Sequence, residues 1–144
     1  MKIFTIGFTK KSAETFFTIL QHAGVKRIVD IRLNNTSQLA GFAKVRDLPF
    51  FLSTIGNISY IHHPEFAPTP DIFENYKKKK GSWEAYEEAY DKLLEKRKTD
   101  SFTSALLRDK DCFLCSESDP DYCHRRLLAE RIQRHQENLE VVHL

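Results

Sequence analysis

Short runs of β-branched and aromatic residues alternate along this chain with longer segments in which apolar residues recur at helical spacing. The short runs have the length and composition of strands, and the longer segments have those of amphipathic helices. The expected strands lie at residues 2–6, 27–31, 58–61, 112–115 and 139–143. This alternation predicts an α/β fold: a single domain over residues 1–144, with a mostly parallel central sheet of about five strands and helices on both faces.

Capping residues mark where several helices should begin and end. Ser12 can cap a helix that Gly24 ends, and this helix connects the first two strands, so we expect those strands to form a parallel pair. Asp119 and Pro120 supply an N-cap followed by a proline at the first helical position, which predicts a last helix running to His135. Further helices are expected at residues 47–55, 71–79, from 82 onward and near 103–108, with a polar loop at 32–43.

Composition narrows the class of protein. The chain is 41% hydrophobic and 29% charged, as is usual for a soluble domain, and no apolar run approaches the ~20 residues that span a bilayer. The apolar start of the chain turns polar at Thr9, which does not resemble a signal peptide. We therefore expect a cytoplasmic protein with no membrane partner and with three reduced cysteines. The net charge of +2 is too small to indicate a nucleic-acid partner by itself.

Candidate chemistry gathers where the expected strands end. Ligands of open parallel sheets bind beyond the carboxyl ends of the strands, which here places Thr9, the segment after Asp30, and His62 near one another. Asp30 and Arg32 alternate on a strand and so share a face. They can supply a carboxylate and an anion-binding guanidinium, or they can form a plain ion pair.

The densest cluster follows the fourth expected strand and holds Cys115, Glu117, Cys123, His124 and Arg125. On a helix beginning at residue 119, His124 faces the sheet. A reactive thiol is one interpretation, because a helix N-terminus and neighbouring cations lower the pKa of a cysteine. A structural role, with packed cysteines and a hydrogen-bonded histidine, is the second.

A metal site is the third interpretation of this cluster, and we expect none. The short paired spacing of zinc ligands is missing, and adjacent Cys123 and His124 would diverge by ~100° on a helix.

A run of lysines at 77–80 adjoins Trp83 and Tyr86. Basic charge interleaved with aromatic rings can bind single-stranded nucleic acid. A lysine-rich helix end beside aromatic core residues is the more common structure with this pattern.

Four motifs in order along the chain resemble the family catalogued as domain of unknown function 488. They are Thr5-Ile6-Gly7-Phe8-Thr9, Val29-Asp30-Ile31-Arg32, Tyr60-Ile61-His62-His63-Pro64-Glu65, and Cys115-Ser116-Glu117 followed by Cys123-His124-Arg125. The sequence departs from the family pattern at Phe8 and Thr9, where His and Ser are usual, and at Asn34 and Asn35, where a proline often follows. The resemblance implies an α/β fold with a pocket built from these motifs, and it implies no activity or cofactor.

These observations favour an enzyme that acts on phosphorylated or nucleic-acid-derived substrates through an anion-binding polar pocket. Arg32 and Arg125 would bind the anion, Glu117 or Asp30 would act as acid or base, and His124 would carry or orient a proton. The candidate catalytic residues are Asp30, Cys115, Glu117 and His124, and the candidate substrate-binding residues are Thr9, Arg32, His62, Cys123 and Arg125. The alternative is a non-catalytic module that binds nucleic acid or protein.

Overall fold

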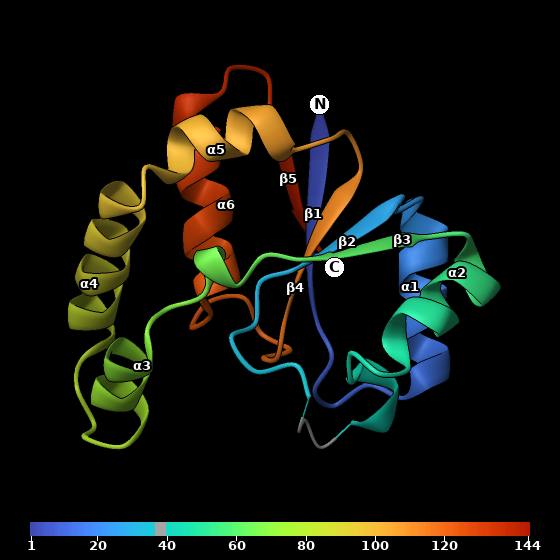
Figure 1. Ribbon diagram of the computed structural model, residues 1–144, viewed down its shortest axis with the longest axis horizontal. Coiled ribbons are helices and arrows are strands. Elements are labelled where there is room, and N and C mark those ends of the chain that lie inside the picture. The colour runs from blue at the N-terminus through green and yellow to red at the C-terminus, as the bar shows by residue number, and fades with distance from the viewer. Residues whose placement is uncertain (37–39) are drawn as a thin grey trace.

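Five parallel strands form the centre of the molecule. The computed structural model describes residues 1–36 and 40–144, and the side chains of all of these except 101–104. The strands are β1 (Lys2–Gly7), β2 (Arg27–Asp30), β3 (Ser59–His62), β4 (Asp111–Cys115) and β5 (Glu140–His143), in the spatial order β3-β2-β4-β1-β5 (Figure 1). Each neighbouring pair is parallel, and each strand lies within one residue of the run that predicted it.

The first two strands run in parallel but are not neighbours. The helix between them carries the chain past one strand position, and β4 fills that position with Phe4 opposite Cys112 on one side and Ile28 opposite Cys112 on the other. The expected direct pairing of the two strands is therefore wrong. The insertion places the end of β4 in the middle of the sheet, next to the ends of both β1 and β2.

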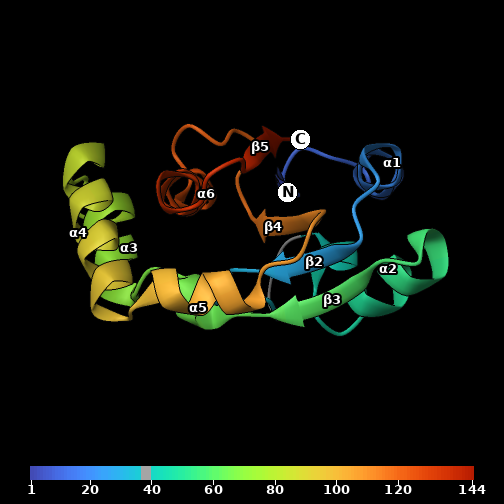
Figure 2. The same ribbon diagram turned by 90° about the horizontal axis from the view of Figure 1, so that it is seen from above.

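Helices cover both faces of the sheet, as predicted. They are α1 (Ala13–Ala23), α2 (Leu48–Gly56), α3 (Pro70–Lys77), α4 (Trp83–Lys96), α5 (Thr99–Leu106) and α6 (His124–His135), with 3-10 turns at Gly41–Ala43 and Pro64–Phe66. Helices α1 and α2 pack on one face, and α4 and α6 pack on the other (Figure 2). Among the described residues, no helix is long and apolar enough to cross a membrane.

Local capping explains where the helices begin. The Ser12 hydroxyl accepts a hydrogen bond from the Thr15 N–H at 3.1 Å, and Gly24 ends α1 with a φ of 77°, as expected. Helix α5 begins at Thr99 rather than near residue 103. The expected loop at 32–43 contains the turn at Gly41–Ala43, and residues 37–39 lie outside the described part.

The predicted start of the last helix is wrong. The Asp119 carboxylate accepts the N–H of Asp121 at 2.9 Å, and the N–H of Cys123 donates to the Pro120 carbonyl at 3.2 Å. These bonds close a separate turn, so the Asp119 carboxylate caps this turn and not the helix. Helix α6 starts at His124, and Cys123 is its N-cap with an extended backbone.

Candidate functional site

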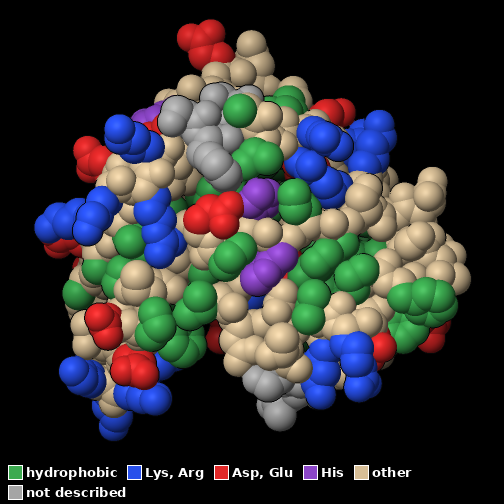
Figure 3. Space-filling model, viewed as in Figure 1, with side chains coloured by type: hydrophobic (Ala, Val, Ile, Leu, Met, Phe, Trp, Pro, Cys, Tyr) green, Lys and Arg blue, Asp and Glu red, His purple; other side chains and the backbone are tan. Residues whose placement is uncertain are grey.

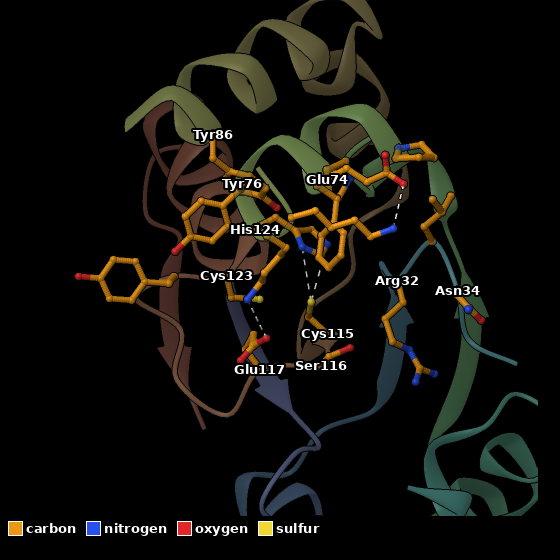
Figure 4. A pocket seen from close by; sticks show the side chains of 17 residues that line it. Arg32, Asn34, Glu74, Tyr76, Tyr86, Cys115, Ser116, Glu117, Cys123 and His124 are labelled. Atoms are coloured by element: carbon orange, nitrogen blue, oxygen red, sulfur yellow. Dashed lines mark hydrogen bonds and ion pairs between the residues drawn. The ribbon is translucent and has the colours of Figure 1, made fainter. Parts of the chain in front are cut away.

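A cavity of about 360 Å³ lies beyond the carboxyl ends of β2 and β4, between the start of α6 and the pair α3 and α4 (Figure 4). Three segments distant in sequence and the single residue Tyr86 line it. The lining residues are Arg32, Leu33 and Asn34; Pro68, Pro70, Phe73, Glu74, Tyr76, Lys77 and Lys78; Tyr86; and Cys115, Ser116, Glu117, Tyr122, Cys123 and His124. The cavity therefore sits where the rule for parallel sheets places a ligand.

Two thiols and an imidazole form the floor of the cavity. Sγ of Cys115 lies 3.5 Å from Nδ1 of His124, and one ligand atom from each of Cys115, Cys123 and His124 lies within 4.8 Å of the others. All three side chains are buried. The expectation that Cys123 and His124 diverge is wrong, because Cys123 precedes the helix and its extended backbone turns its side chain to the same point.

A hydrogen bond to the backbone orients the His124 ring. Its Nε2 lies 3.0 Å from the carbonyl oxygen of Ile31 at the end of β2. A carbonyl only accepts, so Nε2 carries a proton, and Nδ1 is the ring nitrogen nearer to the sulfur of Cys115, at 3.5 Å against 3.9 Å for Nε2. His124 thus lies near the end of β4 as predicted, although the helix that carries it begins at His124 and not at residue 119.

The two thiols at the floor differ in acidity. The hydrogen bond that the Cys115 thiol donates to Cys123, together with burial, raises the pKa of Cys115. The same bond holds the pKa of Cys123 well below its usual range despite burial. Negative charge in this cluster is therefore stabilised on the sulfur of Cys123.

Arg125 lies beneath the loop that joins β4 to α6 and does not line the cavity. It is fully buried and donates to the carbonyl oxygens of Glu117 and Ser118, the latter at 3.1 Å, and to the hydroxyl of Thr5 at 3.2 Å. The hydroxyl of Thr9 donates to the Ser116 carbonyl at 2.8 Å. Thr9 and Arg125, two of the candidate substrate-binding residues, therefore hold in place the loop that carries Glu117.

Asp30 and Arg32 form a buried ion pair, with nitrogen–oxygen distances of 2.8 and 2.9 Å. The Tyr60 hydroxyl donates to the same carboxylate at 2.6 Å, and burial followed by this contact raises the pKa of Tyr60. Arg32 also donates to the Ala43 carbonyl and lies over the ring of Phe8. Asp30 does not line the cavity, and the guanidinium of Arg32 points away from Cys115 (Figure 4).

His62 also contributes to the structure around the site rather than to its lining. Its Nε2 donates to the backbone carbonyl of Arg32 at 2.7 Å, which ties the end of β3 to the segment after β2. Of the nine candidate residues, five line the cavity and four lie behind it. The five are Arg32, Cys115, Glu117, Cys123 and His124; the four are Thr9, Asp30, His62 and Arg125.

Sequence reasoning missed the aromatic wall of the cavity, formed by Phe73, Tyr76, Tyr86 and Tyr122. Behind this wall, Trp83 stacks on Tyr86 with ring centres 4.8 Å apart. The signal was present, because the lysine run at 77–80 adjoins Trp83 and Tyr86, but the same pattern also suits a helix end beside core residues.

Two lysines stand at the edge of this wall. Lys77 lies 3.4 Å from a carboxylate oxygen of Glu117, and Lys78 lies 3.5 Å from one of Glu74. The side chains in these pairs are between two fifths and three quarters exposed, so water screens both pairs.

Comparison with known proteins gives one match. The family described as Domain of unknown function DUF488 matches residues 12–132, a range that contains three of the four motifs on which the resemblance rests. No curated protein and no solved structure matches the chain.

Proposed function

We propose that this chain, which belongs to the family Domain of unknown function DUF488, is an enzyme that acts on a phosphorylated, ring-bearing small molecule such as a nucleotide. One observation carries the proposal: an aromatic-walled cavity at the carboxyl end of a parallel sheet ends on Cys115, Cys123 and His124. Its volume of about 360 Å³ suits a small ligand, for which sites measure ~300–1,000 Å³. Reactive side chains at the end of such a cavity would contact a bound molecule directly.

The wall favours a planar ring. Tyr76 and Tyr86 lie 5.3 Å apart between ring centres, and Trp83 behind them contacts both. These contacts fix the rings before a ligand arrives. Stacking of a nucleobase on an aromatic side chain contributes ~1–3 kcal/mol and tolerates any base.

The lysines favour an anionic substituent on that ring. Exposed ion pairs such as Lys77 with Glu117 and Lys78 with Glu74 contribute only ~0–1 kcal/mol, so a phosphate can replace either carboxylate at little cost. Lys77 is thus a candidate phosphate ligand, and its release would leave Glu117 free.

Glu117 is the best candidate for proton transfer. Its side chain lines the cavity and is half exposed, whereas the carboxylate of Asp30 is fully buried and bonded to Arg32 and Tyr60. We therefore assign acid or base chemistry to Glu117, and we assign Asp30 to the structure of the loop after β2.

A non-catalytic module that binds a nucleic-acid strand is the rival. A strand needs a continuous basic track, because phosphates dominate its affinity. On the face seen in Figure 3, lysines and arginines form separate groups among acidic side chains. This distribution favours a small molecule held in the cavity.

Isothermal titration calorimetry tests the proposal with nucleoside monophosphates, ribose 5-phosphate and a single-stranded oligonucleotide. We expect a nucleoside monophosphate to bind more tightly than ribose 5-phosphate, and Tyr122→Ala to weaken it about 5- to 150-fold through lost stacking. The control is Phe50→Ala, because Phe50 is similarly exposed (66%, against 60% for Tyr122) and lies outside the cavity lining. Failure of all mononucleotides to bind would overturn the proposal, and salt-sensitive binding of the oligonucleotide alone would favour the module.

A further inference from the structure

We infer that Cys115, Cys123 and His124 are three protein ligands of a zinc-type divalent metal ion whose fourth position opens into the cavity. The inference deepens the proposed function by naming the reactive centre of that site. It rests on the proposed function for the use of the metal, and the binding of the metal stands on the geometry of the three residues alone.

The spacing of the donor atoms fits a tetrahedral ion. Zinc binds sulfur at ~2.3 Å and histidine nitrogen at ~2.0–2.1 Å, so tetrahedral angles separate S from N by about 3.5 Å and S from S by about 3.8 Å. The observed distance from Sγ of Cys115 to Nδ1 of His124 is 3.5 Å, and all three donors lie within 4.8 Å of one another. Rotation of the Cys115 and His124 side chains would bring the set onto one ion.

The orientation of His124 is an independent indication. Histidines that bind metals almost always donate their other ring N–H to a carboxylate, a backbone carbonyl or water, which fixes the tautomer and aims the lone pair. Here Nε2 donates to the Ile31 carbonyl at 3.0 Å, which leaves Nδ1 as the ligand atom, and the sulfur of Cys115 lies 3.5 Å from Nδ1 and 3.9 Å from Nε2. Ile31 follows β2, so the end of the sheet holds Nε2 and leaves Nδ1 available to a metal ion.

The number of ligands and their softness identify the kind of site. Two thiolates and an imidazole suit zinc and other borderline-soft ions, whereas magnesium and calcium prefer oxygen. Structural zinc sites are closed by four protein ligands, and catalytic ones keep one position for water or substrate. All three residues line the cavity (Figure 4), so the open position faces the space in which we place the ring-bearing ligand.

Cobalt(II) alone is the probe, because its absorption reports both thiolate ligation and tetrahedral geometry. The full chain, stripped with a chelator and kept in a non-thiol reductant, is titrated with Co²⁺ and then with Zn²⁺. We expect one Co²⁺ per chain with thiolate charge-transfer and tetrahedral bands, displaced by Zn²⁺. Cys123→Ser and His124→Gln should each weaken binding by more than about 100-fold, since even outer partners of metal ligands contribute 10–100-fold.

Cys112→Ala is the matched control, because Cys112 is equally buried but lies in the core beneath α1 and α2. It should keep the parent's stoichiometry and spectrum. An octahedral spectrum, or equal weakening by Cys112→Ala and Cys123→Ser, would overturn the inference. Thermal unfolding of each stripped variant checks that the fold is retained.

Alkylation distinguishes a metal site from a nucleophilic thiol at the same place. Zinc should protect Cys115 and Cys123 from iodoacetamide, and rapid labelling of Cys123 that zinc leaves unchanged would overturn the metal site. Nucleotide binding is measured separately on the same samples. If the chain binds Co²⁺ but no nucleotide, the metal site stands and the proposed function is overturned. If it binds a nucleotide but no Co²⁺, only the metal site is overturned.

Discussion

The carbonyl oxygen of Glu117 lies directly against the α-carbon of Gly7, leaving no room for a side chain between them. Gly7 ends β1, and Glu117 belongs to the loop between β4 and α6, so this contact sets how closely the loop approaches the sheet. A methyl group on Gly7 would overlap the Glu117 carbonyl and reach Nη1 of Arg125 at 3.0 Å. The position of the loop therefore depends on the absence of a side chain at residue 7.

Gly7→Ala should consequently destabilise the protein and disturb the cavity. Overpacking of this kind costs ~1–3 kcal/mol, because the obstacle is backbone and cannot rotate away. Urea denaturation measures the loss. Gly41→Ala is the control, since among the described residues no atom lies within 4 Å of a Cβ added there. Unchanged stability of Gly7→Ala would show that the loop does not depend on this contact.

Arg125→Met should lower the free energy of unfolding by about 2–4 kcal/mol, because buried or half-buried acceptors on Glu117, Ser118 and Thr5 lose their donor. Arg126→Met is a matched control in the next residue. Arg126 contacts the partly exposed carboxylates of Glu87 and Glu130 and the exposed carbonyl of Asp121, so its removal should cost less than that of Arg125. Equal effects of the two changes in chemical denaturation would contradict the structural role given to Arg125.

Asp30→Asn should destabilise the chain by about 3–5 kcal/mol, because it leaves the charge of Arg32 buried without its partner. The double variant Asp30→Asn with Arg32→Met should be the more stable of the two, since both charges are then removed. Thermal and chemical denaturation of both variants tests this order. A fully stable Asp30→Asn chain that fails only in catalysis would instead return Asp30 to the active site.

His143 should make stability depend on pH. Burial, followed by the charge of Arg125, lowers its pKa below the unfolded value, and the Thr5 hydroxyl lies 2.6 Å from its Nδ1. The folded chain thus prefers neutral His143, whereas the unfolded chain takes up the proton near pH ~6.5. Stability from this residue is present above that pH and is lost as pH falls below it toward the lowered folded pKa.

Denaturation midpoints between pH 8 and pH 5 test this dependence. His143→Gln should flatten the decline at acid pH, and His22→Gln, which changes an exposed histidine on α1, should leave it as in the parent. A decline of the same size in parent and His143→Gln would assign it to other groups.

Local patterns predicted the elements well because strands and caps are short-range features. Ser12 and Gly24 bound α1 as expected, and the five β-rich runs became the five strands. The order of the strands was not predictable in the same way, because the composition of the runs does not determine that β4 lies between β1 and β2. The start of α6 was missed because Asp119 caps a turn as effectively as it caps a helix.

The part of the candidate site that follows one strand was predictable from the sequence, whereas the part that depends on the packing of distant helices was not. The rule for strand ends brought Cys115, Glu117, Cys123 and His124 to one place, and these four line the cavity. The wall was not predicted, because its formation depends on how α3 and α4 pack relative to the sheet. Tyr86, for example, is compatible with either a core or a cavity when only its spacing is known.

The floor of the cavity comes from one short, continuous stretch, residues 115–124, whereas most of its wall comes from α3 and α4 some thirty to fifty residues earlier in the chain. Apart from Tyr122, the proposed ring-binding wall and the proposed reactive groups are therefore encoded in separate segments of the gene. The thiols and the imidazole are held from the other side by β4, by Arg125 and by the Ile31 carbonyl, and Tyr90 of α4 contacts the His124 ring. Substitutions at the wall positions of α3, which lie apart from this contact, would change the proposed binding space while residues 115–124 keep their sequence.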